Sequence, residues 1–189
     1  MNDRARVGVF GGEFDPPHDG HLAVARCAIR QLDLDRLVVV PAARPAHRAA
    51  PATPAELRLR MAEAVFAAEP RVGVSRIELD RSGPDYTIDT LEALAEEGEL
   101  FLIVGADHSG FEGWHEPERI VALATLVVAP RPGERGGAAG VIELEMEPVP
   151  RSSTEIRRAI AEGADPHVLV PQAVADIIVA EGLYAEVAC

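Results

Sequence analysis

Hydrophobic residues along this chain occur in two patterns. One is a short continuous apolar run, which is typical of a strand buried on both faces of a parallel sheet. The other repeats apolar residues every three or four positions, which is typical of an amphipathic helix. The first pattern predicts strands at 7–10, 36–41, 100–104 and 126–129. Apolar residues alternate with other residues at 72–80 and 141–146, which predicts two further strands.

Helical segments separate these expected strands. A helix is predicted to start near Asp19, and a second is predicted to be capped by Thr53 through a capping box with Glu56. Further helices are expected at 86–97, 117–123, 152–160 and 172–180. Strands that alternate with helices predict a doubly wound, Rossmann-like α/β fold with a mostly parallel sheet and helices on both faces. Residues 1–189 are expected to form one domain whose last part, about 150–189, is a small helical region, and the ligand crevice should lie at the carboxyl ends of the strands.

The segment between the first strand and the first helix carries the strongest chemical signal. Gly11 and Gly12 are expected in a turn that a ligand can approach closely, because glycine has no Cβ. The start of the following helix offers unpaired N–H groups and the positive end of its dipole, a combination that binds phosphate. His18 and His21 stand at this helix start, three positions apart, so both imidazoles can face the same ligand.

A pair of histidines at a helix start has other interpretations. It can serve only in a local hydrogen-bond network. A zinc site is disfavoured because no third and fourth ligand occurs at a fitting spacing, so no protein-held metal is expected. The glycines also match neither the dinucleotide-binding fingerprint nor the P-loop.

A second helix start, at residues 152–157, offers another phosphate site. The sequence Ser-Ser-Thr-Glu-Ile-Arg contains a capping box from Ser152 to Glu155. Hydroxyl and N–H groups at such a start, with Arg157 beside them, can bind phosphate. Two phosphate sites in one small α/β chain imply a ligand with several phosphates.

Composition narrows the class of protein. The formal net charge is −13, and all 18 basic residues are arginines, so a broad nucleic-acid-binding face is not expected. No apolar run reaches the roughly 18 residues that span a bilayer, and no signal peptide is evident, so a cytoplasmic protein is expected. Cys27 is expected to be a small core residue. Four glutamates are expected on the exposed faces of strands: Glu78, Glu143, Glu145 and Glu147.

Several motifs together resemble one known family. Residues 11–21 follow the form G-G-x-F-D-P-x-H-x-G-H, residues 152–157 the form S-S-T-x-I-R, and residues 86–91 read Y-T-I-D-T-L. These motifs resemble the H-x-G-H nucleotidyltransferases, and among them the bacterial nicotinate-mononucleotide adenylyltransferases, over the span from Val7 to Tyr184. The resemblance implies transfer of AMP from ATP to nicotinate mononucleotide, giving deamido-NAD and pyrophosphate, with Mg²⁺ arriving on ATP. The acidic charge and the lack of a membrane-spanning run predict no nucleic-acid or membrane partner, and a homo-oligomer stays open.

The resemblance also implies a role for particular residues. His18 and His21 would be catalytic, Asp107 would lie near the nucleotide sugar, and Trp114 would lie flat against the pyridine ring. Residues implied at ATP and its phosphates are Gly11, Gly12, Phe14, Ser153, Thr154, Arg157 and Asp107. Residues implied at the acceptor are Arg44, His47, Arg48, Thr87, Trp114 and Arg131.

The chain departs from the family pattern at a few positions. Glu13 stands where the family has serine or threonine, and a carboxylate repels phosphate unless it turns away or reaches a metal or an arginine. Ala46 replaces a proline and Arg48 replaces a lysine in the loop near the acceptor. Two alternatives therefore stay open: a related transferase with another phosphorylated acceptor, and a nucleotide-binding protein without catalysis.

Overall fold

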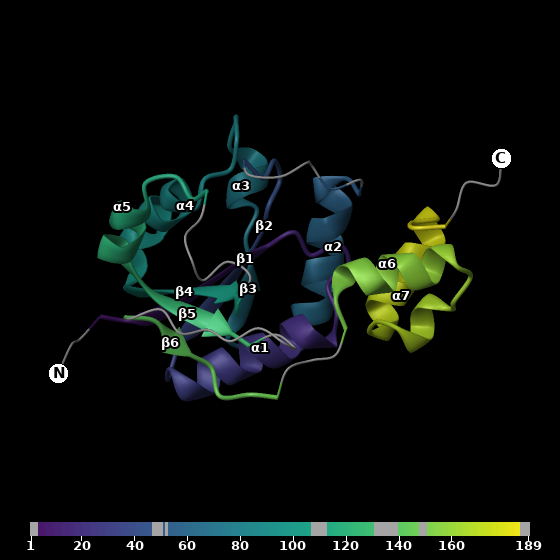
Figure 1. Ribbon diagram of the computed structural model, residues 1–189, viewed down its shortest axis with the longest axis horizontal. Helices are drawn as coiled ribbons and strands as arrows, with labels where there is room; N and C mark the ends of the chain where they lie inside the picture. The colour runs from purple at the N-terminus through teal and green to yellow at the C-terminus, as the bar shows by residue number, and fades with distance from the viewer. Residues whose placement is uncertain are drawn as a thin grey trace.

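A six-stranded parallel sheet forms the centre of the computed structural model, in the order β3-β2-β1-β4-β5-β6 (Figure 1). The structure describes residues 4–46, 51, 53–106, 113–130, 140–147 and 151–185. The strands are β1 (Arg6–Gly12), β2 (Arg36–Pro41), β3 (Val72–Val74), β4 (Glu99–Gly105), β5 (Ala124–Ala129) and β6 (Ile142–Glu143). This is the doubly wound order, and it confirms the fold class expected from the alternating pattern.

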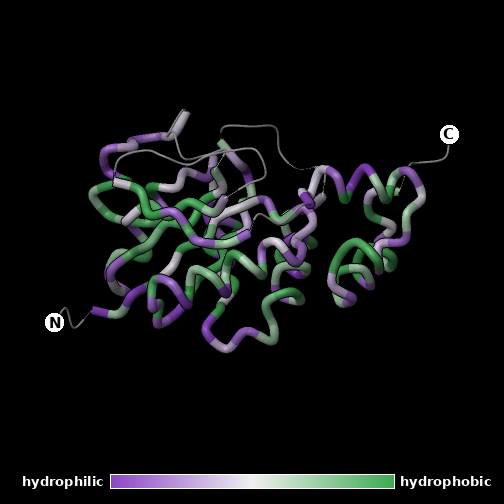
Figure 2. Tube along the Cα trace, turned by 60° about the horizontal axis from the view of Figure 1, so that its bottom comes forward, coloured by the Kyte–Doolittle hydropathy of each residue, from purple (hydrophilic) through white to green (hydrophobic). Residues whose placement is uncertain are grey.

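Helices cover both faces of the sheet. One face packs against α1 (Asp19–Gln31) and α2 (Ala55–Phe66), and Cys27 is buried there as expected. The other face packs against α4 (Thr87–Leu94) and α5 (Pro117–Leu123). Because both faces are covered, the central strands are apolar throughout, which explains their continuous runs. Figure 2 shows the hydrophobic segments concentrated in the interior and the hydrophilic segments around the outside.

The C-terminal helices lie next to α2, on its side away from the sheet (Figure 1). They are α6 (Ser153–Ala161), a 3₁₀ turn at Pro166–Val168, and α7 (Gln172–Glu181). Their apolar side chains join the core cluster that lies between the sheet, α1 and α2. In the described ranges, no helix combines the length and the apolar character needed to cross a membrane.

Two expected strands are shorter than the sequence predicted. The alternation over 72–80 gives a strand only at Val72–Val74, and residues Ile77–Asp80 form the short helix α3 instead. The Oγ atom of Ser75 accepts the N–H of Ile77 at 3.3 Å, so the chain turns away from the sheet directly after β3. The edge strand expected at 141–146 is limited to Ile142–Glu143.

Two local predictions about turns and caps were also wrong. Gly11 and Gly12 do not form a turn, since they end β1 and pair with Val40 and Pro41 of β2. Helix α2 has Pro54 as its N-cap with no side-chain cap, so the expected capping box from Thr53 does not form. Thr53 is buried, and its carbonyl oxygen accepts a hydrogen bond from the side chain of Arg58 instead.

Candidate active site

A cavity of about 950 Å³ opens at the carboxyl ends of β1, β4 and β5. It lies where the strand order changes direction between β1 and β4, which is the usual ligand position in a doubly wound sheet. The starts of α1, α4 and α6 also contribute to its wall. The crevice predicted from the sequence is therefore present, and its volume suits a ligand as large as a nucleotide.

The two histidines form the cap of helix α1 and line this cavity. His18 is the N-cap, and its Nδ1 accepts the N–H of Gly20 at 3.0 Å. The Nδ1 of His21 accepts the backbone N–H of His18 at 3.2 Å, and the two ring centroids are 4.1 Å apart. Because each Nδ1 acts as an acceptor, each neutral ring carries its proton on Nε2. The hydrogen-bond network considered as an alternative thus exists, and it fixes the tautomer of two imidazoles beside the cavity.

The residues at the end of β1 differ in what they offer a ligand. A Cβ added to Gly11 would meet no atom within 4 Å, whereas one added to Gly12 would lie 3.2 Å from the ring of Phe14. Phe14 is buried, and its ring centroid lies 5.0 Å from that of His21 and 5.5 Å from that of Phe10. Gly11 therefore leaves backbone open to the cavity, while Phe14 supports the histidine ring.

The start of α6 lies across the same cavity, which brings together the two phosphate sites predicted from the sequence. The capping box forms as expected: the Ser152 N–H donates to Glu155 at 2.7 Å, and the Glu155 N–H donates to Ser152 at 3.2 Å. These contacts with Ser152 lower the pKa of Glu155. The Ser153 hydroxyl donates to the carbonyl oxygen of Pro16 at 2.9 Å, and Arg157 donates to that of Asp15 at 2.6 Å.

The loop at residues 13–16 is held by residues that the sequence analysis missed. Arg58, only 1% exposed, donates from Nη1 to the carbonyl oxygen of Glu13 at 2.7 Å. Tyr184 donates to the Oδ1 atom of Asp15, a residue 3% exposed, at 2.6 Å. Burial lowers the pKa of Arg58, and the charges of Asp15 and Glu13 act in the opposite direction. The carboxylate of Glu13 thus has a buried arginine within electrostatic reach, the circumstance under which it can be tolerated beside phosphate.

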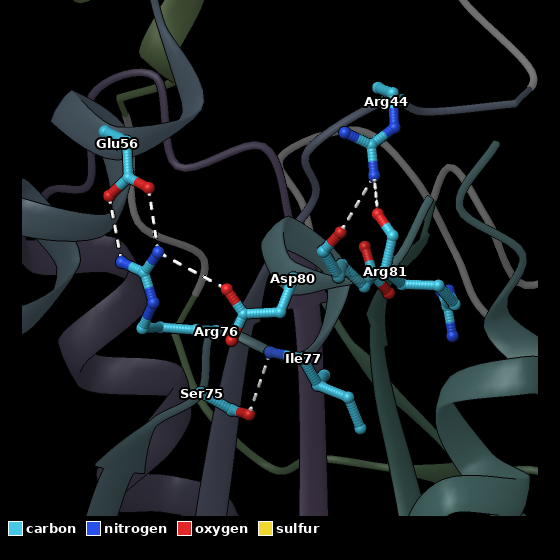
Figure 3. Close-up of polar contacts among 8 residues, drawn as sticks. Arg44, Glu56, Ser75, Arg76, Ile77, Asp80 and Arg81 are labelled. Carbon is cyan, nitrogen blue, oxygen red and sulfur yellow. Dashed lines mark hydrogen bonds and ion pairs between the residues drawn. The ribbon is translucent and has the colours of Figure 1, made fainter. Parts of the chain in front are cut away.

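The expected acceptor residues are only partly brought together. Thr87 and Trp114 both line the cavity; Thr87 is the first residue of α4, and Trp114 is partly buried against the apolar cluster under α4 and α5. The guanidinium of Arg44 instead donates to the backbone carbonyl oxygens of Glu78, Arg81 and Gly83. Figure 3 shows the contact with Arg81. Four other predicted site residues lie outside the described residues: His47, Arg48, Asp107 and Arg131.

Glu78 corrects one expectation. It was expected on an exposed strand face, but it lies in helix α3, is 8% exposed and lines the cavity. Its Oε1 accepts the Thr90 hydroxyl at 2.8 Å. Burial raises the pKa of Glu78 to about 7, and the hydrogen bond from Thr90 opposes part of that shift. Across the described ranges, no group of three or more His, Cys, Asp or Glu side chains is arranged to hold a metal ion.

The chain is similar to known proteins in sequence and in structure. A family model described as cytidylyltransferase-like matches residues 9–159. A Thermus thermophilus protein named "Probable nicotinate-nucleotide adenylyltransferase" is 46% identical over 185 residues, which cover 95% of this chain and 99% of that protein. A Leifsonia xyli protein of the same name is 41% identical, with 98% and 96% of the two chains covered.

Solved structures show the same fold. Nicotinic acid mononucleotide adenylyltransferase of Plasmodium falciparum, complexed with NaAD, superimposes with a TM-score of 0.75 over 95% of this chain and 97% of that one. The same enzyme complexed with APC gives a TM-score of 0.73 with the same coverage. Sequence identity is 18% in both cases, so this likeness concerns the fold alone.

Proposed function

This chain belongs to the nicotinate-nucleotide adenylyltransferases of the cytidylyltransferase-like family, and from that premise we propose that it transfers AMP from ATP to nicotinate mononucleotide. The products are deamido-NAD and pyrophosphate. The observation that carries this proposal is the pair of helix starts, α1 with its two histidines and α6 with Ser153 and Arg157, on the wall of one cavity. That arrangement suits a triphosphate, which can occupy both anion sites at once.

The chemistry needs positioning and charge stabilisation. A phosphate oxygen of the acceptor attacks the α-phosphorus of ATP in line, a P–O bond forms, and the bond to pyrophosphate breaks. His18 and His21 donate from Nε2 to the oxygens where negative charge grows, supported by the positive end of the α1 dipole. The bonds that Nδ1 of each ring makes to the backbone hold these donors in place before the substrate arrives.

The outer phosphates are assigned to the start of α6. Ser153, Thr154 and Arg157 line the cavity there, and a guanidinium with five N–H donors can keep its bond to Asp15 while it binds phosphate. Mg²⁺ would arrive on ATP and be held mostly by phosphate oxygens and water, and Glu13 on the cavity wall is a carboxylate of the kind that Mg²⁺ also accepts. When bound, the metal would neutralise charge on the triphosphate. Asp107 is assigned to the nucleotide sugar by family resemblance.

The acceptor is assigned to the opposite wall. Thr87 and Trp114 would contact the pyridine ring and its carboxylate, with His47, Arg48 and Arg131 near the acceptor phosphate. Arg44 is left out of this set because its guanidinium is bound to carbonyl groups. A second candidate is the same transfer to another phosphorylated acceptor, which the carboxylates of Glu13 and Glu78 on the cavity wall favour.

Pyrophosphate release from ATP and Mg²⁺, measured across a panel of mononucleotides, tests the reaction and its acceptor. Nicotinate mononucleotide should give the highest kcat/KM. A higher value with another acceptor would favour the second candidate, and ATP binding without release would contradict catalysis.

Substitutions that keep the helix cap isolate the role of the imidazoles. His21→Gln retains an oxygen that can accept the N–H of residue 18, and His18→Asn retains a good N-cap. Each should lower kcat by about 10²- to 10³-fold with little change in melting temperature. His167→Gln, at an exposed histidine in the C-terminal region, is the matched control and should keep wild-type turnover. Near-normal turnover in His21→Gln would contradict the catalytic assignment.

A further inference from the structure

The loop after β2 is tied by its backbone to the segment that precedes α4. The N–H of Arg44 donates to the Oδ2 atom of Asp85, and the N–H of Asp85 donates to the carbonyl oxygen of Arg44 at 2.9 Å. Pro45 and Asp85 also form an isolated parallel β-bridge. These contacts, together with those of the Arg44 guanidinium described next, are called the 44–85 clamp.

The side chain of Arg44 adds contacts to the same segment. Its Nε donates to the carbonyl oxygen of Gly83 at 2.6 Å, and its Nη2 donates to those of Glu78, at 3.2 Å, and Arg81 (Figure 3). Two of these carbonyl groups belong to or follow helix α3, where a helix end carries unpaired acceptors and partial negative charge. A planar guanidinium fork can serve several such acceptors at once, which the single ammonium of lysine does poorly.

Asp85 makes this clamp costly to open. Its side chain is 3% exposed, and the Nη2 atom of Arg81 lies 3.9 Å from its Oδ1 atom. Within the described ranges, its Oδ1 has no hydrogen-bond partner, so the bond from the Arg44 N–H to Oδ2 is a main compensation for the buried charge. A buried carboxylate that loses its partner is strongly unfavourable, and this favours the closed arrangement.

The clamp builds part of the cavity wall. Pro45, Ala46, Asp85 and Thr87 all line the cavity, whereas Arg44 does not. We propose that Arg44 and Asp85 are positioning residues that fix the acceptor-side wall, and that Arg44 does not bind the acceptor phosphate. This proposal rests on the function proposed above for the identity of the acceptor, although the clamp itself is a feature of the fold.

Kinetics with matched substitutions separate positioning from direct binding. Arg44→Ala and Asp85→Ala should each raise the KM for nicotinate mononucleotide about tenfold, with little change in the KM for ATP. Asp85→Asn removes the charge but keeps an oxygen that can accept the Arg44 N–H, so its KM should stay much closer to wild type. Equal effects of the Ala and Asn variants would overturn the hydrogen-bond argument. Arg76→Ala is the matched control, because Arg76 is an exposed arginine paired with Glu56 and does not line the cavity.

A ligand without phosphate provides the sharper test. The nucleoside of the acceptor, nicotinate riboside, is measured as a competitive inhibitor against the mononucleotide. If Arg44 positions the wall, Arg44→Ala weakens the binding of the nucleoside and of the mononucleotide by the same factor. A loss confined to the mononucleotide would mean that Arg44 binds the phosphate, and the proposal would be wrong.

Amide hydrogen exchange tests the clamp independently of any activity. The N–H groups of Arg44 and Asp85 should exchange slowly in the wild-type protein. Arg44→Lys, the milder variant in case Arg44→Ala folds poorly, should speed exchange at both positions by about tenfold or more, whereas Arg76→Ala should leave it unchanged. Unchanged exchange in Arg44→Lys would overturn the clamp even if the enzyme is active. Faster exchange in a protein that lacks transferase activity would keep the clamp and reject the proposed function.

Discussion

Tyr184 and Asp15, 169 positions apart in the chain, are joined by a 2.6 Å hydrogen bond from the phenol to a carboxylate oxygen. This contact connects the residues after α7 with the loop that leads into the histidine cap of α1. Arg58 and Arg157 hold the carbonyl oxygens of the same loop, at Glu13 and Asp15. The loop that presents the histidines therefore depends on groups from three distant parts of the chain.

Replacing Tyr184 by phenylalanine should destabilise the protein. The change leaves a buried carboxylate without its hydroxyl donor, which costs about 1.5–3 kcal/mol of unfolding free energy. Urea unfolding at pH 7 measures the loss. A variant with a wild-type midpoint would show that the bond contributes nothing.

Tyr184 should also make folding stability depend on pH in the alkaline range. Burial, and then the bond to Asp15, raise the pKa of Tyr184 above its ordinary value of 10.0. Because the folded state holds this proton more tightly than the unfolded chain does, the contribution is complete below pH 10 and is lost as the pH rises further. The difference in unfolding free energy between wild type and Tyr184→Phe should therefore become smaller above pH 10.

Alanine at Gly11 should affect activity, whereas alanine at Gly8 should affect stability. A methyl group at Gly11 meets no protein atom within 4 Å, so Gly11→Ala should keep stability within about 0.5 kcal/mol. It should lower kcat/KM about tenfold or more, because Gly11 lines the cavity proposed to hold the substrate. A methyl at Gly8 would lie 2.7 Å from the Cδ1 atom of Leu34, so Gly8→Ala should cost about 1–3 kcal/mol of stability. Thermal melts and kinetics on both variants check this. Full activity in Gly11→Ala would place the ligand elsewhere.

Glu78 should make stability depend on pH between 4.5 and 7. Its pKa rises from 4.5 to about 7 on folding, chiefly through burial, so the folded state binds the proton more tightly. The resulting stabilisation is complete below pH 4.5 and is lost as the pH rises through 7. Glu78→Gln can still accept the Thr90 hydroxyl without charge, so at pH 8 it should be more stable than wild type by on the order of 2–3 kcal/mol. The two proteins should converge near pH 4.5, and a constant difference across the range would contradict this account.

His167 should give a smaller pH effect in the C-terminal region. It lies 2.9 Å from Asp165 and 3.1 Å from Asp176, and its bonds to Asp165 and then Asp176 raise its pKa above 6.5. The folded-state pKa is the higher one, so this stabilisation is complete below pH 6.5 and is lost as the pH rises through the raised pKa. Melting temperatures from pH 5.5 to 8.5 should fall more for wild type than for His167→Gln. Parallel curves would rule out the contribution.

The central strands were predictable because they are buried on both faces. Residues 36–41 and 100–104 form continuous apolar runs, and both correspond to observed strands with nearly the expected bounds. The short strand β3 was not predictable in its length, because alternation over 72–80 fits a half-exposed strand as well as a strand followed by helix α3. Glu78 was misplaced for the same reason, since a residue on an assumed strand face was in fact turned into the protein.

The candidate site also contains some contacts that the sequence predicts and others that it does not. The capping box at Ser152 was predictable because its partners lie three positions apart. The same short spacing made a local hydrogen-bond network of His18 and His21 one of the alternatives. The bonds of Arg44 and Arg58 are made to backbone carbonyl groups, which every residue has and which leave no mark in the sequence. Tyr184 meets Asp15 only in the folded chain, and no spacing rule links the two positions.

The anchoring of the loop at residues 13–16 by Ser153, Arg157 and Tyr184 has a consequence for biosynthesis. The ribosome makes the loop well before it makes Tyr184, so an emerging polypeptide can pair β1 with β2 long before the histidine cap has all of its supports. The site is therefore completed only after residue 184 has been made, and a product truncated shortly before that residue would have the sheet without all the contacts that hold the loop.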